Sequence, residues 1–256
     1  MIGTSESSAL MDIFLDFGET MMFAGAEIGR IEDSLARMGK AYGAVNTNVF
    51  VITSSIELTM TFTDGDSITR TRRIRAGGTD FEKLRRLNAL SRRCASERVP
   101  VEQLKEELTK IQGIHMHRWK FYLGGVIAAG SFSLFFGGSL LDALLSGIFA
   151  LFVSWLQERF ADICPNKIFF LFVSSLLTGI GICLVAKLTP MVHIDKIIIG
   201  DIMLLVPGIS ITNAVRDTLI GDTISGMTKL ADSLVWAAAL AAGFMIAISL
   251  FAGWMV

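Results

Sequence analysis

The sequence predicts an α-helical membrane bundle of five transmembrane helices, the fourth interrupted at Pro207-Gly208, preceded by a small α+β cytoplasmic domain. The charge distribution divides the 256 residues into two parts. Residues 1–118 hold 16 Lys+Arg and 16 Asp+Glu, whereas residues 119–256 hold only 7 and 8. Long apolar stretches with few charges are typical of membrane helices. Residues 1–118 are therefore the predicted cytoplasmic domain, and residues 119–256 the predicted five-span domain.

The cytoplasmic domain begins with a helical pattern. Apolar residues recur at spacings of three and four from Leu10 to Met38. This spacing predicts one long amphipathic helix, or two helices joined near Gly25.

A three-stranded meander is expected next. The segment I56-E-L-T-M-T-F62 alternates apolar and polar residues with the period of two of a half-buried strand. Asp64-Gly65 is a strong signal for a hairpin turn. The predicted strands are 49–53, 56–62 and 67–75, and the predicted helices that follow are about 79–97 and 101–113. The order α-β-β-β-α-α indicates a small α+β domain.

Two charged segments of this domain allow more than one interpretation. In E27-I-G-R-I-E-D33, Arg30 fits i,i+3 pairing with Glu27 or Asp33, whereas a buried pair of carboxylates would be of functional interest. The third strand carries a run of arginines, which face solvent or meet anionic lipid headgroups: Arg70, Arg72, Arg73 and Arg75.

The membrane half provides apolar length for five spans. Residues 121–157 carry one charge, Asp142, and suffice for two short spans joined at Gly137-Gly138-Ser139. The predicted spans are about 119–137, 140–157, 168–187, 197–215 and 231–255. Small residues recur four apart within them, as at Ser175 and Gly179, which predicts close helix packing.

Lysine and arginine in the short loops predict the orientation in the membrane. If residues 1–118 are cytoplasmic, six basic residues lie at the inner ends of the spans and only Lys187 and Lys196 lie in the outer loops. We therefore expect a multi-pass protein whose N-terminus is cytoplasmic. Five spans place the C-terminus on the opposite side.

The fourth span has two unusual features. Proline lacks the N–H group that continues a helix, so Pro207 should break or kink it. Broken helices near the membrane midplane present binding sites in many transporters, and a kinked structural helix is the alternative. Asp201 lies within the same span, where a carboxylate is costly and usually faces a cavity or a partner. The alternative for Asp201 is that its side chain extends to the nearby membrane–water interface.

Composition and motifs exclude several functions. The net charge of −1 argues against nucleic acid as a main partner. Cys94, Cys164 and Cys183 indicate no disulfide framework. The sequence contains neither a P-loop nor a G-x-S-x-G motif, and we predict no catalytic residue, metal ligand or cofactor.

The chain resembles the bacterial threonine/serine exporter family, specifically its N-terminal half-protein. The segments that carry the resemblance are G25-A-E-I-G-R-I-E-D33, V51-I-T-S-S-I-E-L-T59, L205-V-P-G-I-S-I-T-N-A-V-R-D217, G221-D222 and S225-G226. The resemblance implies a cytoplasmic domain followed by five spans in the bacterial inner membrane. Fused members continue into a second membrane half, whereas split members, including a branch linked to succinate export, use a separate smaller membrane protein. A chain that stops at Val256 is similar to the split form, which implies a second, smaller membrane subunit as partner, with a homo-oligomer as the alternative.

The implied function is a subunit of a secondary exporter that moves threonine and serine, or small dicarboxylates such as succinate, out of the cytoplasm. The alternatives are a membrane-tethered hydrolase and a non-transporting regulatory or assembly subunit. We expect transport and no enzymatic activity.

The candidate substrate site surrounds the break. On a helix that begins there, Gly208, Thr212 and Arg216 stack four apart on one face. Arg216 could hold a substrate carboxylate in bidentate fashion, and Asp201 could take an ammonium group or a coupling proton. The candidate substrate-binding residues are Asp201, Pro207, Gly208, Ser210, Thr212, Asn213, Arg216 and Asp217. The alternative for Arg216 and Asp217 is that they only mark the cytoplasmic interface.

Overall fold

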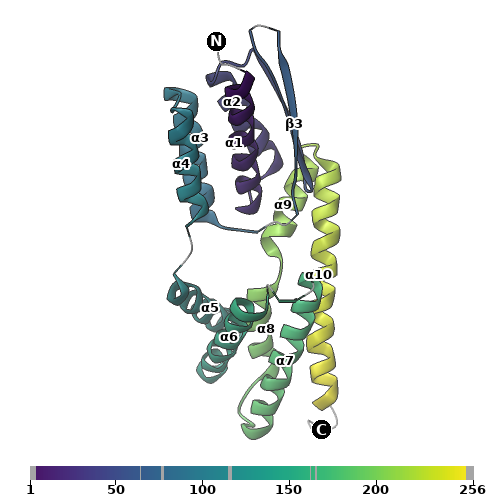
Figure 1. The fold of residues 1–256 in the computed structure, drawn as a ribbon. Helices are drawn as coiled ribbons and strands as arrows, with labels where there is room; N and C mark the ends of the chain where they lie inside the picture. Colours follow the sequence, from purple (N-terminus) through teal and green to yellow (C-terminus); the bar gives the residue numbers. More distant parts are fainter. Residues whose placement is uncertain are drawn as a thin grey trace. The chain divides into compact units, whose positions relative to one another are not determined.

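The computed structural model describes residues 4–63, 65–75, 78–114, 117–161, 163–164 and 166–251. This part of the chain contains ten helices and a three-stranded sheet (Figure 1). It divides into two compact units. The first unit consists of Met1–His115 and Asn213–Lys229, and the second of Met116–Thr212 and Leu230–Val256.

The first unit begins with two helices, α1 (Thr4–Phe23) and α2 (Ile28–Ala41). They are separated at Gly25, whose φ of +86° lies in the left-handed region that glycine adopts most readily. Of the two expected arrangements, the pair of helices joined near Gly25 is therefore correct.

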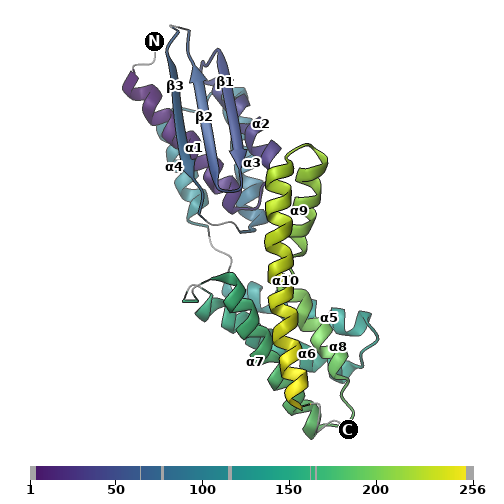
Figure 2. The same ribbon diagram turned by 90° about the vertical axis from the view of Figure 1, so that its right-hand side faces the viewer.

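The sheet is an antiparallel meander, in the order β1 (Asn46–Ile52), β2 (Ser55–Thr61) and β3 (Ser67–Arg73) (Figure 2). The alternation predicted for the central strand is present, because Ile56, Leu58 and Met60 are buried and their neighbours are not. Gly65 has a φ of +86°, as the predicted hairpin requires. Asp64 of that turn lies outside the described residues.

The arginines of β3 are partly used inside the unit. Arg70 forms an ion pair with Asp12 at 2.5 Å. Arg72 contacts Asp16 at 2.7 Å and Glu19 at 3.0 Å. All three carboxylates lie on α1, so two of the four arginines bind the strand to this helix rather than facing only solvent or lipid.

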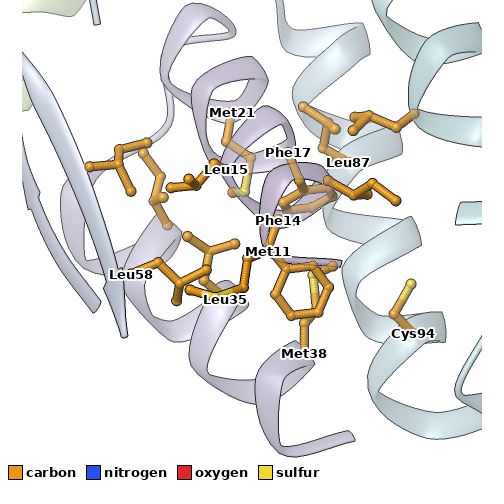
Figure 3. Packing of buried hydrophobic residues seen from close by; sticks show 14 of the residues in the cluster. Met11, Phe14, Leu15, Phe17, Met21, Leu35, Met38, Leu58, Leu87 and Cys94 are labelled. Carbon is orange, nitrogen blue, oxygen red and sulfur yellow. The ribbon is translucent and has the colours of Figure 1, made fainter. Parts of the chain in front are cut away.

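Helices α3 (Phe81–Glu97) and α4 (Val101–Gln112) complete the predicted order of the unit. Asp80 caps α3, because its carboxylate accepts a hydrogen bond from the Lys83 N–H at 3.0 Å. Helices α1 and α2 lie between the sheet and the α3–α4 pair (Figure 1). The core forms between these layers (Figure 3), and among its labelled members are Phe14, Phe17, Leu35, Leu58, Leu87 and Cys94.

The second unit is built from long apolar helices. Helices α6 (Leu140–Phe160), α7 (Lys167–Leu188) and α10 (Thr223–Phe251) are each long and apolar enough to cross a membrane. Helices α8 (Ile194–Leu205) and α9 (Gly208–Leu219) pass the same test only as a pair. The described residues thus give three spanning helices, or four if the pair is one span.

The predicted count of five spans is therefore not confirmed. The first predicted span lies in α5 (Arg118–Phe135), which is not among the helices that pass the test. Its first turn carries Arg118 and Lys120, and these charges lower the mean hydropathy of a helix of only 18 residues.

Small residues allow the helices of the second unit to pack closely, as predicted. A Cβ atom placed on Gly243 of α10 would overlap the Ser175 hydroxyl of α7 and lie 2.6 Å from the Phe172 carbonyl oxygen. A Cβ on Gly179 of α7 would lie 2.7 Å from the Cβ of Ala247 on α10. These helices therefore touch along a face of small side chains.

Candidate functional site

The predicted break at Pro207-Gly208 is present. Helix α8 ends at Leu205 and α9 begins at Gly208, with the two axes bent by 54°. Val206 has an extended backbone with φ −60° and ψ 130°, the conformation favoured before proline. The Pro207 carbonyl oxygen accepts the first bond of the new helix, from the Ile211 N–H at 3.0 Å. The break thus follows from proline chemistry at a single position.

The polar residues just after the break make local contacts. The Thr212 hydroxyl donates to the Gly208 carbonyl oxygen at 3.0 Å, one turn back along α9. The Ser210 and Ser233 hydroxyls lie 2.9 Å apart, and this bond joins α9 to α10. Gly208 is exposed, and a Cβ atom placed on it would meet no other atom within 4 Å. There is therefore free space beside the first turn of α9, where the helix dipole favours anions, although the Gly208 N–H itself donates to the Val206 carbonyl oxygen at 2.8 Å.

Asp201 is the most unusual residue of the second unit. It lies on α8 and is fully buried. The Ser146 hydroxyl of α6 lies 3.4 Å from Oδ1, which is a long hydrogen bond, and Oδ2 has no hydrogen-bond partner among the described residues. A buried carboxylate with an unsatisfied oxygen and no paired cation is costly, so such positions usually serve a function.

The surroundings of Asp201 are tightly packed and polar. The preceding residue, Gly200, brings α8 against two helices at once. A Cβ atom at Gly200 would lie 2.6 Å from the Ala129 carbonyl oxygen of α5 and would overlap the Ser146 hydroxyl of α6. Ser133 of α5 is also fully buried, and its hydroxyl has no partner among the described residues. One carboxyl group and two hydroxyl groups are thus enclosed where three helices meet.

Asp142 has a different role from Asp201. Its side chain and that of Ser139 form a capping box at the start of α6, so Asp142 serves the end of this helix. Its carboxylate also accepts bonds from the His193 N–H and lies 2.9 Å from Nδ1 of the same residue. These contacts connect the start of α6 to the start of α8.

Arg216 and Asn213 belong to the first unit. Nη1 of Arg216 lies 2.6 Å from Oε1 of Glu27, the residue just before α2. Arg30 approaches the same carboxylate oxygen at 3.9 Å, in the predicted i,i+3 pair. Asn213 is half-buried. The guanidinium group thus already has a carboxylate partner, so binding a substrate carboxylate there would require exchange of partners.

Asp217 is the buried member of an ion pair in the first unit. Its Oδ2 lies 2.6 Å from Nζ of Lys229, which joins α9 to α10 across the turn at Gly221. The carboxylate is fully buried and the lysine is 17% exposed. This environment suits a structural contact that holds the two helices together.

The sequence predicts the break and draws attention to Asp201 and Asp217, which are both buried, but not to their partners. Ser133 and Ser146 have no distinguishing spacing within their apolar stretches. Glu27 was noted only for pairing along its own helix, whereas its shortest ion pair joins it to Arg216, 189 positions away. The only available signal was Gly200, since a small residue beside an aspartate in a membrane span indicates a close helix contact.

A long apolar bundle with an interrupted span and a buried carboxylate defines a membrane protein of the transporter class. Residues 12–251 match the model of the family ThrE, described as "Putative threonine/serine exporter". The chain therefore belongs to this threonine/serine exporter family, a family of membrane transport proteins.

The curated relatives are distant but extend along most of the chain. One is the "Probable threonine/serine exporter" of Mycobacterium tuberculosis, 22% identical over 246 residues, which cover 93% of this chain and 46% of that protein. Another is the "Probable succinate transporter subunit YjjP" of Escherichia coli, 21% identical over 259 residues, which cover 98% and 99%. The protein of that name in Klebsiella aerogenes is also 21% identical. The chain thus spans about half the length of the first relative and nearly all of the others. No solved structure matches the chain significantly.

Proposed function

We propose that the protein is the larger membrane subunit of a secondary exporter, which moves small amino acids such as threonine and serine, or small dicarboxylates such as succinate, out of the bacterial cytoplasm. The single observation that carries this proposal is the break between α8 and α9 with Asp201 buried six residues before it. The relatives support it, since one is named a threonine/serine exporter and two are named succinate transporter subunits.

Asp201 is the proposed coupling residue. An ionised carboxylate without a paired cation is strongly disfavoured in a buried position, so the carboxyl group holds a proton in the closed bundle. Opening the contacts of α8 with α5 and α6 would admit water and release that proton. Ser146 and Ser133 are the neighbouring groups that would accept or donate hydrogen bonds in the two states.

Substrate binding is proposed at the free first turn of α9. Both substrate types carry a carboxylate, which the positive end of a helix dipole attracts. Pro207 and Gly208 form this turn, and Ser210, Thr212 and Asn213 follow it. In this proposal Arg216 supports the far end of α9 through Glu27, and Asp217 supports it through Lys229.

The proposed orientation has the N-terminus in the cytoplasm of a bacterial inner membrane. Residues 213–229 cluster with residues 1–115 in one unit, which supports a common side for the domain and for the loop after the fourth predicted span. Arg216 and Lys229 of that loop are among the basic residues assigned to the inside.

A second, smaller membrane subunit is the proposed partner. The chain aligns along nearly the full length of relatives that are named subunits, and it covers only 46% of the exporter from Mycobacterium tuberculosis. The remainder of that longer protein would correspond to the partner. A homo-oligomer of this chain is the alternative source of the missing half.

The test is efflux of preloaded radiolabelled threonine, serine and succinate from bacterial cells that express the chain with its partner. Asn is nearly isosteric with Asp and does not ionise, so Asp201→Asn should reduce efflux by tenfold or more at matched membrane abundance. Asp195→Asn is the matched control, because Asp195 lies on the same helix but is 64% exposed and pairs with Lys196. Normal efflux of all three compounds by Asp201→Asn would refute the coupling role.

A further inference from the structure

A polar cavity of about 550 Å³ lies within the first unit. Helices α2, α3 and α9 contribute to its walls, with Arg216 from α9 and Ile220 just after that helix. The volume falls in the usual range of about 300–1,000 Å³ for small-molecule sites. Unlike most such sites, its walls are charged rather than apolar, so its occupant should be a small charged molecule.

Two of the three acidic side chains of the cavity, Glu27 and Glu32, are less exposed than its arginines. The half-buried or buried groups are Glu27, Glu32, Asn88 and Ser91. The other charged residues that line the cavity are exposed: Arg30, Asp33, Arg37, Arg92 and Arg216. A molecule that carries both a positive and a negative group would therefore fit this distribution.

Several of these charges are not neutralised within the protein. Arg216 and Arg30 both contact Glu27. In contrast, Asp33 and the two exposed arginines Arg37 and Arg92 form no ion pair within the described part of the chain. A guanidinium group that is free in a cavity wall can bind a carboxylate with two parallel hydrogen bonds.

Glu32 shows that the part of the cavity around it lacks positive charge. Its carboxylate accepts a hydrogen bond from the Val51 N–H at 3.0 Å. Its pKa is nevertheless raised, mainly by burial and further by Asp222 and Asp33. An ammonium group placed beside Glu32 and Asp33 would relieve this unfavourable environment.

We propose that this cavity binds a free α-amino acid in its zwitterionic form, with the ammonium group held by Glu32 and Asp33 and the carboxylate by Arg37 and Arg92. The proposal concerns the first unit alone and does not depend on the intramembrane site. It places a recognition site for an amino acid beside Arg216 of α9, the helix that begins at the break. A bound amino acid would lie next to the ion pair between Arg216 and Glu27 and would therefore change its strength.

The experiment measures equilibrium binding of radiolabelled L-threonine to the purified full-length protein in lipid nanodiscs. We expect saturable binding that N-acetyl-threonine, threonine amide and succinate do not displace, because each lacks one of the two charged groups. Arg92→Gln and Asp33→Asn should each weaken binding tenfold or more. Both positions are exposed, so these variants should fold, and their thermal unfolding would verify that.

Arg85→Gln is the matched control, since Arg85 lies on α3 outside the cavity and pairs with Glu82. It should bind threonine as the unmodified protein does. The proposal is overturned if threonine does not bind at millimolar concentration, if succinate displaces it fully, or if Arg92→Gln and Asp33→Asn retain normal affinity. If the unmodified protein binds threonine but cells that express it with its partner do not export threonine, serine or succinate, the proposed transport function is contradicted and the proposed amino-acid site is not.

Discussion

At the scale of single residues, the ion pair of Asp217 and Lys229 has a high desolvation cost and a short distance between its charged atoms. Removing a carboxylate from water is expensive, and only a close cation repays it. The two atoms lie 2.6 Å apart, and the carboxylate is fully buried. A buried ion pair adds little to the free energy of unfolding compared with an apolar pair of the same size. Loss of one member, however, leaves a buried charge without a partner.

We therefore predict that Lys229→Met lowers the free energy of unfolding by about 3–5 kcal/mol. The double variant Asp217→Asn/Lys229→Met should recover most of this loss, because no buried charge remains. Chemical denaturation in detergent would measure both values. Lys110→Met is the control, since Lys110 forms an exposed pair with Glu106 and should leave stability unchanged. Equal stability of Lys229→Met and the unmodified protein would show that the pair is not buried in solution.

Glu32 gives a pH-dependent prediction of opposite sign from most carboxylates. Its pKa is raised in the folded protein from the ordinary value of 4.5. Its contribution to stability is therefore fully present below about pH 4.5 and is lost as the pH rises through the folded pKa. In the variant Glu32→Gln this side chain carries no charge at any pH.

This variant should raise Tm by about 1–3 °C at pH 7.5, and the difference should vanish below about pH 4.5. Thermal unfolding across this pH range is the measurement. Glu57→Gln, at an exposed position on β2, is the control and should match the unmodified protein throughout. A lower Tm for Glu32→Gln at pH 7.5 would mean that the ionised carboxylate has a partner that stabilises it.

At the scale of elements, the turn between α9 and α10 depends on a close approach at Gly226. A Cβ atom there would overlap the Thr218 hydroxyl and lie 2.8 Å from both the Ala214 carbonyl oxygen and the Thr218 nitrogen. Two of these three are backbone atoms, which cannot move aside without shifting the helix. The first turn of α9 is the opposite case, because a Cβ at Gly208 meets nothing within 4 Å.

Gly226→Ala should therefore destabilise the protein by about 1–3 kcal/mol through overpacking. Gly208→Ala is the matched substitution and should leave stability within about 0.5 kcal/mol of the original value. Denaturation curves of the two variants decide between these outcomes. If both were equally stable, α9 and α10 would not be in contact at Gly226.

Local chemistry explains which elements could be predicted from the sequence. Gly25 and Pro207 act through their own backbone dihedral angles, so the breaks that they cause are visible without knowledge of tertiary structure. The central strand was predictable because its apolar and polar residues alternate with a period of two. The ends of helices were less predictable: α10 begins at Thr223, whereas apolar residues alone predict a start near 231. Its first two turns, up to Lys229, belong to the first unit, and hydropathy does not report such an assignment.

At the scale of the whole molecule, the orientation in the membrane remains a prediction from loop charge. We expect Met191, in the loop between α7 and α8, to lie outside and Ser96, at the end of α3, to lie inside. In a variant whose native cysteines are replaced, Met191→Cys should react with a membrane-impermeant maleimide on intact spheroplasts. Ser96→Cys should react only after lysis. The reverse pattern would place the N-terminus outside and contradict the proposed orientation.

The candidate site illustrates what sequence cannot supply at this scale. The break and its neighbouring polar residues are contiguous in the chain, so they could be proposed together. The partners of Asp201 and Arg216 come from other helices, and nothing in their local sequence marks them. Pairing across such distances depends on how helices pack, and packing is decided by the whole set of apolar faces.

Asn213–Lys229 belong to the same unit as the first 115 residues. The two parts of this unit are therefore synthesised at different times. The ribosome must make about another hundred residues before Arg216 can reach Glu27, which takes on the order of ten seconds at ~10 residues per second. The apolar core around Phe14 and Leu35 needs none of these late residues and can form at once. The charged surface around Glu27 stays uncovered until α9 has been synthesised and inserted with the membrane helices. During that interval chaperones can bind the nascent domain.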